Sequence, residues 1–146
     1  MSVDLMVRPP SLENESKATV EQYKHEFDKL FGTLKTKAKY LETVLGTMKG
    51  VSTQPVEGAL YAFPKVDLPK KFVEEATSLG READLHYCMM MLEEIGLVCV
   101  PGSGFKQKPG TWHYRTTILP APVEFFYKAF DDLKILNDKI MDKYSK

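Results

Sequence analysis

The sequence predicts an α+β domain in which a small sheet of three to four strands, mixed or antiparallel, is covered on one face by long helices. Apolar residues recur at steps of three and four over residues 19–48 and 125–140, which is the helical period. Short runs rich in β-branched and aromatic residues lie between these stretches, bounded by Gly and Pro. At 146 residues the chain is long enough for one core that buries about two-thirds of the unfolded surface.

The first part of the chain is predicted to be a linker followed by a long helix. Pro9 and Pro10 disfavour a helix immediately before them, so we expect a linker over residues 1–18 and the folded domain over 19–146. The apolar face of the helix consists of Val20, Tyr23, Phe27, Leu30, Phe31, Leu34, Ala38, Leu41, Leu45 and Met48. A stripe of this length also suits a coiled coil, but its crowded aromatic residues and the strands that follow favour a helix that covers a sheet.

The middle of the chain predicts a strand pair and a short helix. Val51–Gln54 and Ala59–Phe63 are strand candidates on either side of the turn at Pro55–Gly58, which suggests an antiparallel pair. Lys70–Leu79 is expected to form one or two helical turns that Gly80 closes.

Two further helices are predicted in the second half. Asp84 is the expected N-cap of a helix that runs to Ile95 and stops at Gly96. Pro120 and Pro122 stand at the start of the last helix. Its expected buried stripe consists of Phe125, Phe126, Ala129, Phe130, Leu133, Leu136 and Ile140.

Between these helices the sequence predicts a strand, a loop and a second strand. Val98–Val100 is expected to be a short buried strand, Pro101–Gly110 a loop and Trp112–Ile118 a strand. Strand side chains alternate between faces, so three residues should share one side: His113, Arg115 and Thr117. A guanidinium held there presents a planar fork of donors that suits a carboxylate.

With these residues in view, the chain resembles the C-terminal small domain of the alanine aminotransferase family, pyridoxal-phosphate enzymes of fold type I. The resemblance covers nearly all 146 residues and rests on VDLMVRPP (3–10), PVEGALYAFPKV (55–66), HYCMMMLEEIGLVCVPGSGF (86–105) and GTWHYRTTILP (110–120). It implies a homodimeric enzyme that transfers the amino group between L-alanine and 2-oxoglutarate, giving pyruvate and L-glutamate. A glutamate:glyoxylate-type enzyme is a related alternative.

The resemblance also implies a role for Arg115, which is to bind the carboxylate of the amino-acid and 2-oxo-acid substrates. The alternative is an arginine on an edge strand that faces water. Lys106 stands where the family usually has glycine, and Trp112 and Tyr114 stand where other aromatic residues are common. These departures leave the geometry of the loop open.

The resemblance implies pyridoxal 5'-phosphate as the cofactor of the full-length enzyme, held by a Schiff-base lysine. Lys17 lacks the glycine-rich, arginine-containing stretch that accompanies this lysine in the family, so we interpret it as a solvated residue. We expect the chain to be a fragment without the larger domain, with no catalytic, cofactor-binding or metal-binding residue, inactive by itself. A non-catalytic interaction module is the alternative, and such a fragment would tend to self-associate.

Composition excludes several classes of partner and site. The 20 basic and 20 acidic residues balance, which argues against binding to nucleic acid or to an anionic membrane, and no apolar run is long enough for a bilayer span. Cys88 and Cys99 lack a CxxC spacing, so we expect buried free thiols in a reducing compartment, the cytoplasm, with a mitochondrial location as the alternative.

Other patterns carry less specific chemistry. Gly102-Ser103-Gly104 matches no phosphate-binding motif, Met89–Met91 suit core packing rather than a soft metal, and Glu93 and Glu94 should point apart. The histidines are too scattered for a metal site: His25, His86 and His113.

Overall fold

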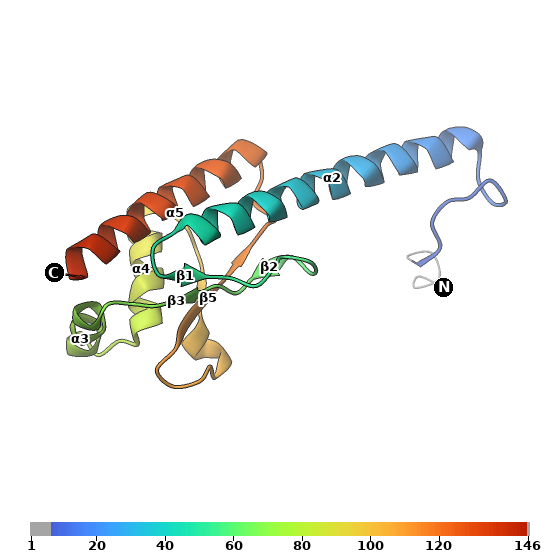
Figure 1. Cartoon of the computed structure of the whole chain (residues 1–146). Coiled ribbons are helices and arrows are strands. Elements are labelled where there is room, and N and C mark those ends of the chain that lie inside the picture. The colour runs from blue at the N-terminus through green and yellow to red at the C-terminus, as the bar shows by residue number, and fades with distance from the viewer. Residues whose placement is uncertain (1–6, 146) are drawn as a thin grey trace. The chain divides into compact units, whose positions relative to one another are not determined.

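The computed structural model describes residues 7–145 (Figure 1). The chain forms two compact units, one up to Thr36 and one from Lys37, and helix α2 (Lys17–Thr47) runs through the boundary. Residues 3–6 of the segment VDLMVRPP, and with them the first part of the predicted linker, lie outside the described residues.

In the N-terminal unit, Ser16 sets the start of α2. Its Oγ accepts the backbone N–H of Thr19 at 3.2 Å, the bond that an N-cap residue makes. The helix therefore begins at Lys17, two residues before the predicted start. The described part of the predicted linker contains a turn, which the backbone N–H of Ser11 closes by donating to Asn14 Oδ1 at 2.9 Å.

The second unit contains an antiparallel sheet with β5 (Trp112–Thr117) at its centre. β2 (Tyr61–Ala62) and β3 (Lys65–Val66) pair with β5 in one continuous register, and β1 (Val51–Ser52) pairs with β3. β4 (Val100–Pro101) also pairs with β5. The predicted α+β class is thus confirmed, with an antiparallel sheet of very short strands around one longer strand.

The predicted pairing of the two strands around Pro55–Gly58 is wrong. Val51 lies opposite Val66, not opposite a residue of β2. Residues 61–66 run as one bent strand that is interrupted at Pro64, which has no N–H to donate. Both halves of this strand pair with the long strand β5, a partner distant in sequence, and this ladder replaces the local hairpin that the turn residues suggested.

The predicted buried strand at Val98–Val100 is also misplaced. Val98 is 72% exposed, and β4 begins only at Val100. The backbone N–H of Leu97 still bonds to the carbonyl of Met91 at 3.2 Å, and Gly96 is left-handed with φ 69°. The chain is therefore completing a helix cap where the sequence suggested a strand.

Helices cover one face of this sheet (Figure 1). They are α3 (Lys70–Ser78), α4 (Ala83–Ile95) and α5 (Val123–Tyr144). α4 contacts β4 and β5, and α3 and α5 each contact α4. The largest fully buried side chains include Tyr87, Tyr114, Phe72, Phe126, Phe130, Leu41, Leu45 and Leu133. Phe125 was predicted in the buried stripe of α5 but is 65% exposed, because Phe126 takes the inward position of that turn.

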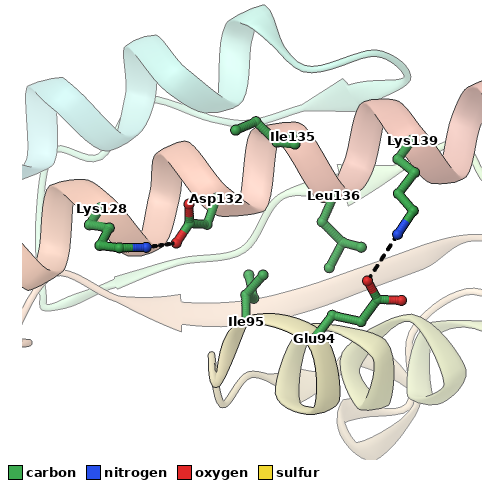
Figure 2. Close-up of a pocket in the computed structure, with 7 residues that line it drawn as sticks. All are labelled: Glu94, Ile95, Lys128, Asp132, Ile135, Leu136 and Lys139. Atoms are coloured by element: carbon green, nitrogen blue, oxygen red, sulfur yellow. Dashed lines mark hydrogen bonds and ion pairs between the residues drawn. The ribbon is translucent and has the colours of Figure 1, made fainter.

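The junction of α4 with α5 leaves a hollow of about 420 Å³ (Figure 2). Ile95, Ile135 and Leu136 line its apolar part. Lys128 pairs with Asp132, and Lys139 pairs with Glu94 at 3.2 Å. Glu94 is thus engaged in an ion pair and does not form an acid/base pair with Glu93. None of the helices within residues 7–145 is both long and apolar enough to cross a membrane.

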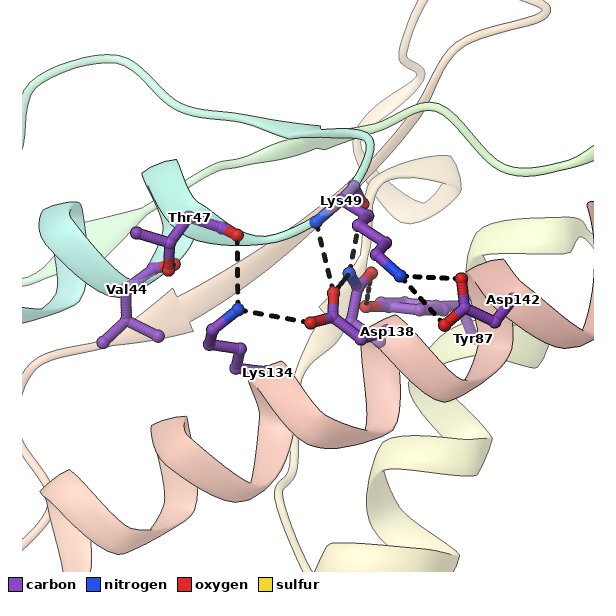
Figure 3. A network of polar contacts seen from close by, with 8 residues as sticks. Val44, Thr47, Lys49, Tyr87, Lys134, Asp138 and Asp142 are labelled. Atoms are coloured by element: carbon purple, nitrogen blue, oxygen red, sulfur yellow. Dashed lines mark hydrogen bonds and ion pairs between the residues drawn. The ribbon is translucent and has the colours of Figure 1, made fainter.

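A buried amide joins three segments that are distant in sequence, two of which carry Tyr87 and Lys49 (Figure 3). Asn137 on α5 is fully buried, and its Oδ1 accepts the Tyr87 hydroxyl of α4 at 3.0 Å. Its Nδ2 donates to the carbonyl of Lys49, after α2, at 3.1 Å. Because every polar atom of this amide has a protein partner, its burial fixes the relative position of the three segments.

Asp138 extends the same network at the surface. Its carboxylate accepts Lys134 Nζ at 3.2 Å and the backbone N–H of Lys49 at 3.4 Å. Partial burial opposes ionisation, but these bonds prevail and lower the pKa of Asp138. The stability that this carboxylate contributes is therefore present above the ordinary pKa of aspartate and is lost as the pH falls through the lowered pKa.

The 3-10 helix η1 (Gly102–Phe105) ends in a strained residue. Lys106 has φ 55° and ψ 44°, the left-handed conformation that a side chain disfavours. The position at which the sequence departs from the usual glycine is thus one that glycine would occupy without strain.

We expect Asn137→Ala to lower the free energy of unfolding by about 2–4 kcal/mol, because it leaves the buried Tyr87 hydroxyl without a partner and removes the bond to the part-buried Lys49 carbonyl. Urea unfolding followed by circular dichroism measures this loss. Ile135→Ala, at a position of the same helix that is 67% exposed, is the control and should change stability by less than about 0.5 kcal/mol. A similar small effect for both variants would contradict the role of the amide.

Lys106→Gly should stabilise the chain by up to about 1 kcal/mol, the left-handed strain of about 1–2 kcal/mol minus the entropy that glycine loses on folding. The same urea experiment checks it. Lys108→Gly, in the same loop but without a positive φ, should be neutral or destabilising. Destabilisation by Lys106→Gly would show that the side chain makes contacts that outweigh the strain.

Candidate functional site

Arg115 lies on the face of β5 that the helices do not cover. Its neighbours Tyr114 and Thr116 are 1% and 4% exposed and form part of the core. Side chains alternate along a strand, so Arg115 takes the outer face together with His113 and Thr117, all half-buried. This arrangement agrees with the face predicted from the sequence.

Two aromatic rings contact the Arg115 guanidinium. Its Cζ lies 4.7 Å from the ring centroid of Tyr61 and 5.1 Å from that of Phe105, within the range of cation–π attraction. Tyr61 lies opposite Thr117 in the β2–β5 register, which makes it a diagonal neighbour of Arg115 on the same face. Within residues 7–145 the guanidinium pairs with no carboxylate, so its in-plane donors lack an acidic partner there.

Tyr61, Phe63 and Phe105 form an exposed aromatic cluster around this guanidinium. They are 48%, 42% and 45% exposed. The ring of Phe63 meets that of Phe105 edge-on, with centroids 5.6 Å apart, and stacks on His113 at 5.1 Å with an interplanar angle of 4°. A cluster of exposed apolar side chains is typical of a surface that binds a ligand or another protein. No sequence pattern pointed to these three residues, although Phe105 follows the Gly102-Ser103-Gly104 stretch in the expected loop.

A cavity of about 490 Å³ lies beside the aromatic cluster. Tyr61, Phe63, Lys65 and His113 contribute to its lining; Arg115 does not. Lys65 pairs with Asp67 at 2.6 Å. Burial, and after it the charge of Lys65, lower the pKa of His113, so its imidazole is neutral at neutral pH.

Asp84, the predicted N-cap of α4, has a different role. Glu82 occupies the N-cap position, and Asp84 lies in the first turn with only 2% of its surface exposed. Its Oδ2 accepts the backbone N–H of Ser103 at 2.6 Å and Gln107 Nε2 at 2.8 Å. The carboxylate is therefore directed at the loop that carries Phe105, because this loop supplies the donors that a buried charge requires.

Gln107 connects Asp84 to His113. Because its Nε2 donates to Asp84, its Oε1 accepts, and the 2.9 Å contact to His113 Nδ1 places a proton on Nδ1. A Cβ on Gly102 would lie 2.2 Å from Gln107 Oε1 and 2.9 Å from His113 Cβ. This glycine thus makes room for the Gln107 amide.

The other residues considered in the sequence do not gather into a second site. Lys17 is solvated, with its side chain 82% exposed and 3.7 Å from Glu21. His86 is buried against Phe72, and within residues 7–145 no group of three His, Cys, Asp or Glu could hold a metal.

Both cysteines are free thiols, as predicted, although only Cys88 is fully buried and Cys99 is half-buried. Burial raises the pKa of both thiols, that of Cys99 to about 11, so neither is a ready nucleophile. Met91 is completely buried, in keeping with core packing.

No family model matches the chain, but its sequence is similar to those of known enzymes. The chain is 44% identical over 144 residues to a probable mitochondrial alanine aminotransferase from Dictyostelium discoideum, which covers 97% of the chain and 26% of that protein. It is 41% identical over 143 residues to alanine aminotransferase 1 from Homo sapiens, covering 98% of the chain and 28% of that protein. The chain thus spans about a quarter of the length of these relatives.

A solved structure agrees. The alanine aminotransferase from Pyrococcus furiosus superimposes with a TM-score of 0.60 and 28% identity over 81% of the chain and 26% of that protein. Over nearly its whole length the chain therefore belongs to the alanine aminotransferase family, in which it corresponds to the C-terminal part.

Proposed function

We propose that this chain supplies the carboxylate-binding arginine of an alanine aminotransferase, which transfers the amino group between L-alanine and 2-oxoglutarate. Arg115 binds the carboxylate next to the reacting carbon of the amino acid or 2-oxo acid. The observation that carries the proposal is a guanidinium on the central strand, in contact with two aromatic rings and without a carboxylate partner among residues 7–145. The relatives described above are named for alanine, which favours this substrate over a glutamate:glyoxylate type.

The surroundings of Arg115 suit a bidentate carboxylate. A guanidinium donates in its own plane, and Arg115 has two rings close to its Cζ but no acidic partner for these donors among residues 7–145, so a carboxylate can bind along the edge. Strand β5 pairs with β2, β3 and β4. This pairing limits the backbone movement that would weaken the contact between Arg115 and a carboxylate.

The described residues do not fit the cofactor pyridoxal phosphate. A Schiff-base lysine must lie free in a pocket, but Lys65, which lines the cavity beside the aromatic cluster, is paired with Asp67 at 2.6 Å. We propose that the chain by itself neither binds pyridoxal phosphate nor transaminates, and that these properties, like the homodimer, belong to the full-length enzyme.

A second candidate function is an interaction module, and one observation in the N-terminal unit favours it. Phe27, Leu30 and Phe31 on α2 are 43%, 60% and 45% exposed, although the sequence pattern predicted that they would be covered. Tyr23, Phe27 and Phe31 form a ladder of stacked rings, with centroids 5.9 and 4.6 Å apart. We propose that this apolar face promotes self-association of the chain.

Binding of 2-oxoglutarate or pyruvate should shift the Arg115 side-chain signal in NMR spectra of the isolated chain. One charge-assisted contact of about 1.5–3 kcal/mol corresponds to a dissociation constant of about 6–80 mM. Arg115→Lys keeps the charge but loses the planar fork, and it should weaken the response of the backbone signals of residues 112–117 severalfold. Arg81 in the same spectrum and neutral lactamide at matched ionic strength are the controls. Equal shifts of Arg115 and Arg81 would refute the assignment.

Self-association predicts that the mass from light scattering rises with concentration above the monomer mass of 16.6 kDa. The double variant Phe27→Glu/Phe31→Lys should stay monomeric, because it places charges on the apolar face. Phe125→Glu, an equally conspicuous exposed aromatic position in the other unit, is the control and should behave like the unaltered chain. A monomer at all concentrations would end the proposal of self-association.

A further inference from the structure

We propose that Asp84 and Gln107 are positioning residues for Arg115, which hold the loop of residues 102–107 so that the Phe105 ring covers the guanidinium. Neither residue makes a hydrogen bond or ion pair with Arg115. Their consequence for a carboxylate ligand rests on the proposed function, whereas their effect on the Arg115 side chain does not.

The loop is fastened on both sides of Phe105 by one buried carboxylate. Asp84 Oδ2 accepts Ser103 N–H, within η1, and Gln107 Nε2, just beyond it. Asp84 Oδ1 accepts the N–H of Leu85 at 2.9 Å. Three donors therefore compensate the burial of this charge, and two of them belong to the loop. Phe105 lies between these two attachment points in the chain.

A second attachment leads from the loop to β5. Gln107 Oε1 accepts from His113 Nδ1, and the His113 ring stacks on Phe63, whose ring in turn meets the edge of Phe105. Gln107 thus bridges α4 and β5. The bridge requires Gly102, because a side chain there would collide with the Gln107 amide. The loop is consequently held by a helix on one side and by the arginine-bearing strand on the other.

This arrangement decides how Arg115 is held. The guanidinium makes no ion pair among residues 7–145, so its orientation there depends on Tyr61, from the neighbouring strand, and on Phe105, from the loop. An arginine side chain carries about 2 kcal/mol of rotamer entropy. If Phe105 moves away, Arg115 regains part of this freedom and must lose it again when a ligand binds.

The chain contains three arginines, Arg8, Arg81 and Arg115, so an arginine-labelled sample gives a readily assigned NMR spectrum. Aromatic ring currents should shift the Arg115 side-chain protons away from those of Arg81. Phe105→Leu removes one ring and defines the size of its contribution. Gln107→Ala and Asp84→Asn keep Phe105 but release the loop, and each should abolish most of that same contribution. Lys108→Ala, next to Gln107 and without a side-chain bond among the described residues, should leave the Arg115 signals unchanged.

The double variant Gln107→Ala/Phe105→Leu provides the decisive comparison. If Gln107 acts on Arg115 through Phe105, the double variant will show the Arg115 shifts of Phe105→Leu alone. Unchanged Arg115 signals in Gln107→Ala, or additive shifts in the double variant, would overturn the proposal. Gln107 is a half-buried loop residue, so its variant remains informative even where Asp84→Asn reduces folding.

A ligand titration separates this inference from the proposed function. All shifts above are measured without ligand, so failure of 2-oxoglutarate to bind would leave them valid. If both proposals hold, Gln107→Ala will weaken the Arg115 response to 2-oxoglutarate severalfold, whereas Lys108→Ala will not. Binding of unaltered strength in a Gln107→Ala chain whose Arg115 signals have moved would show that the loop orders Arg115 without contributing to affinity.

Discussion

The alternation of side chains along β5 is the constraint on which the core and the candidate site both depend. Tyr114 and Thr116 point into the core beneath the helices, and Arg115 and His113 consequently point out. A shift of one residue in this strand would bury the guanidinium and expose the Tyr114 ring. Pairing with β2, β3 and β4 fixes the register, so the same ladder that closes the core also presents the arginine.

Two buried polar side chains connect segments that hydrophobic packing alone would leave free to slide. Asn137 ties α5 to α4 and to the turn after α2, and Asp84 ties α4 to the loop before β5. Burial of each side chain is tolerated because its polar atoms have hydrogen-bond partners. Removal of a partner would leave a polar atom without a hydrogen bond. The first connection serves the core, whereas the second reaches the surface around Arg115. Hydrogen bonds to Asp84 therefore connect the loop that carries Phe105 of the aromatic cluster to the buried part of the domain.

The chain spans about a quarter of the length of its alanine aminotransferase relatives. Among residues 7–145, two groups of aromatic side chains are exposed at its surface. One set surrounds Arg115, and the other forms the stacked ladder on α2. The two groups differ physically. The first surrounds a guanidinium that has no acidic partner among the described residues, which suits an anionic ligand. The second is an apolar helix face without such a charge, which suits another protein surface.

The sequence by itself determined the features that depend on neighbouring residues: the helical periods of α2 and α5, the glycine that ends α4, and the strand and face of Arg115. These follow from local periodicity and backbone preference, which a short segment carries with it. Only the tertiary structure decided that β1 pairs with β3, that Asp84 holds a loop instead of capping a helix, and that Phe105 lies over Arg115. Residues far apart in the chain make these contacts, and their stability comes from the pairing of specific donors, acceptors and rings, which no local pattern encodes.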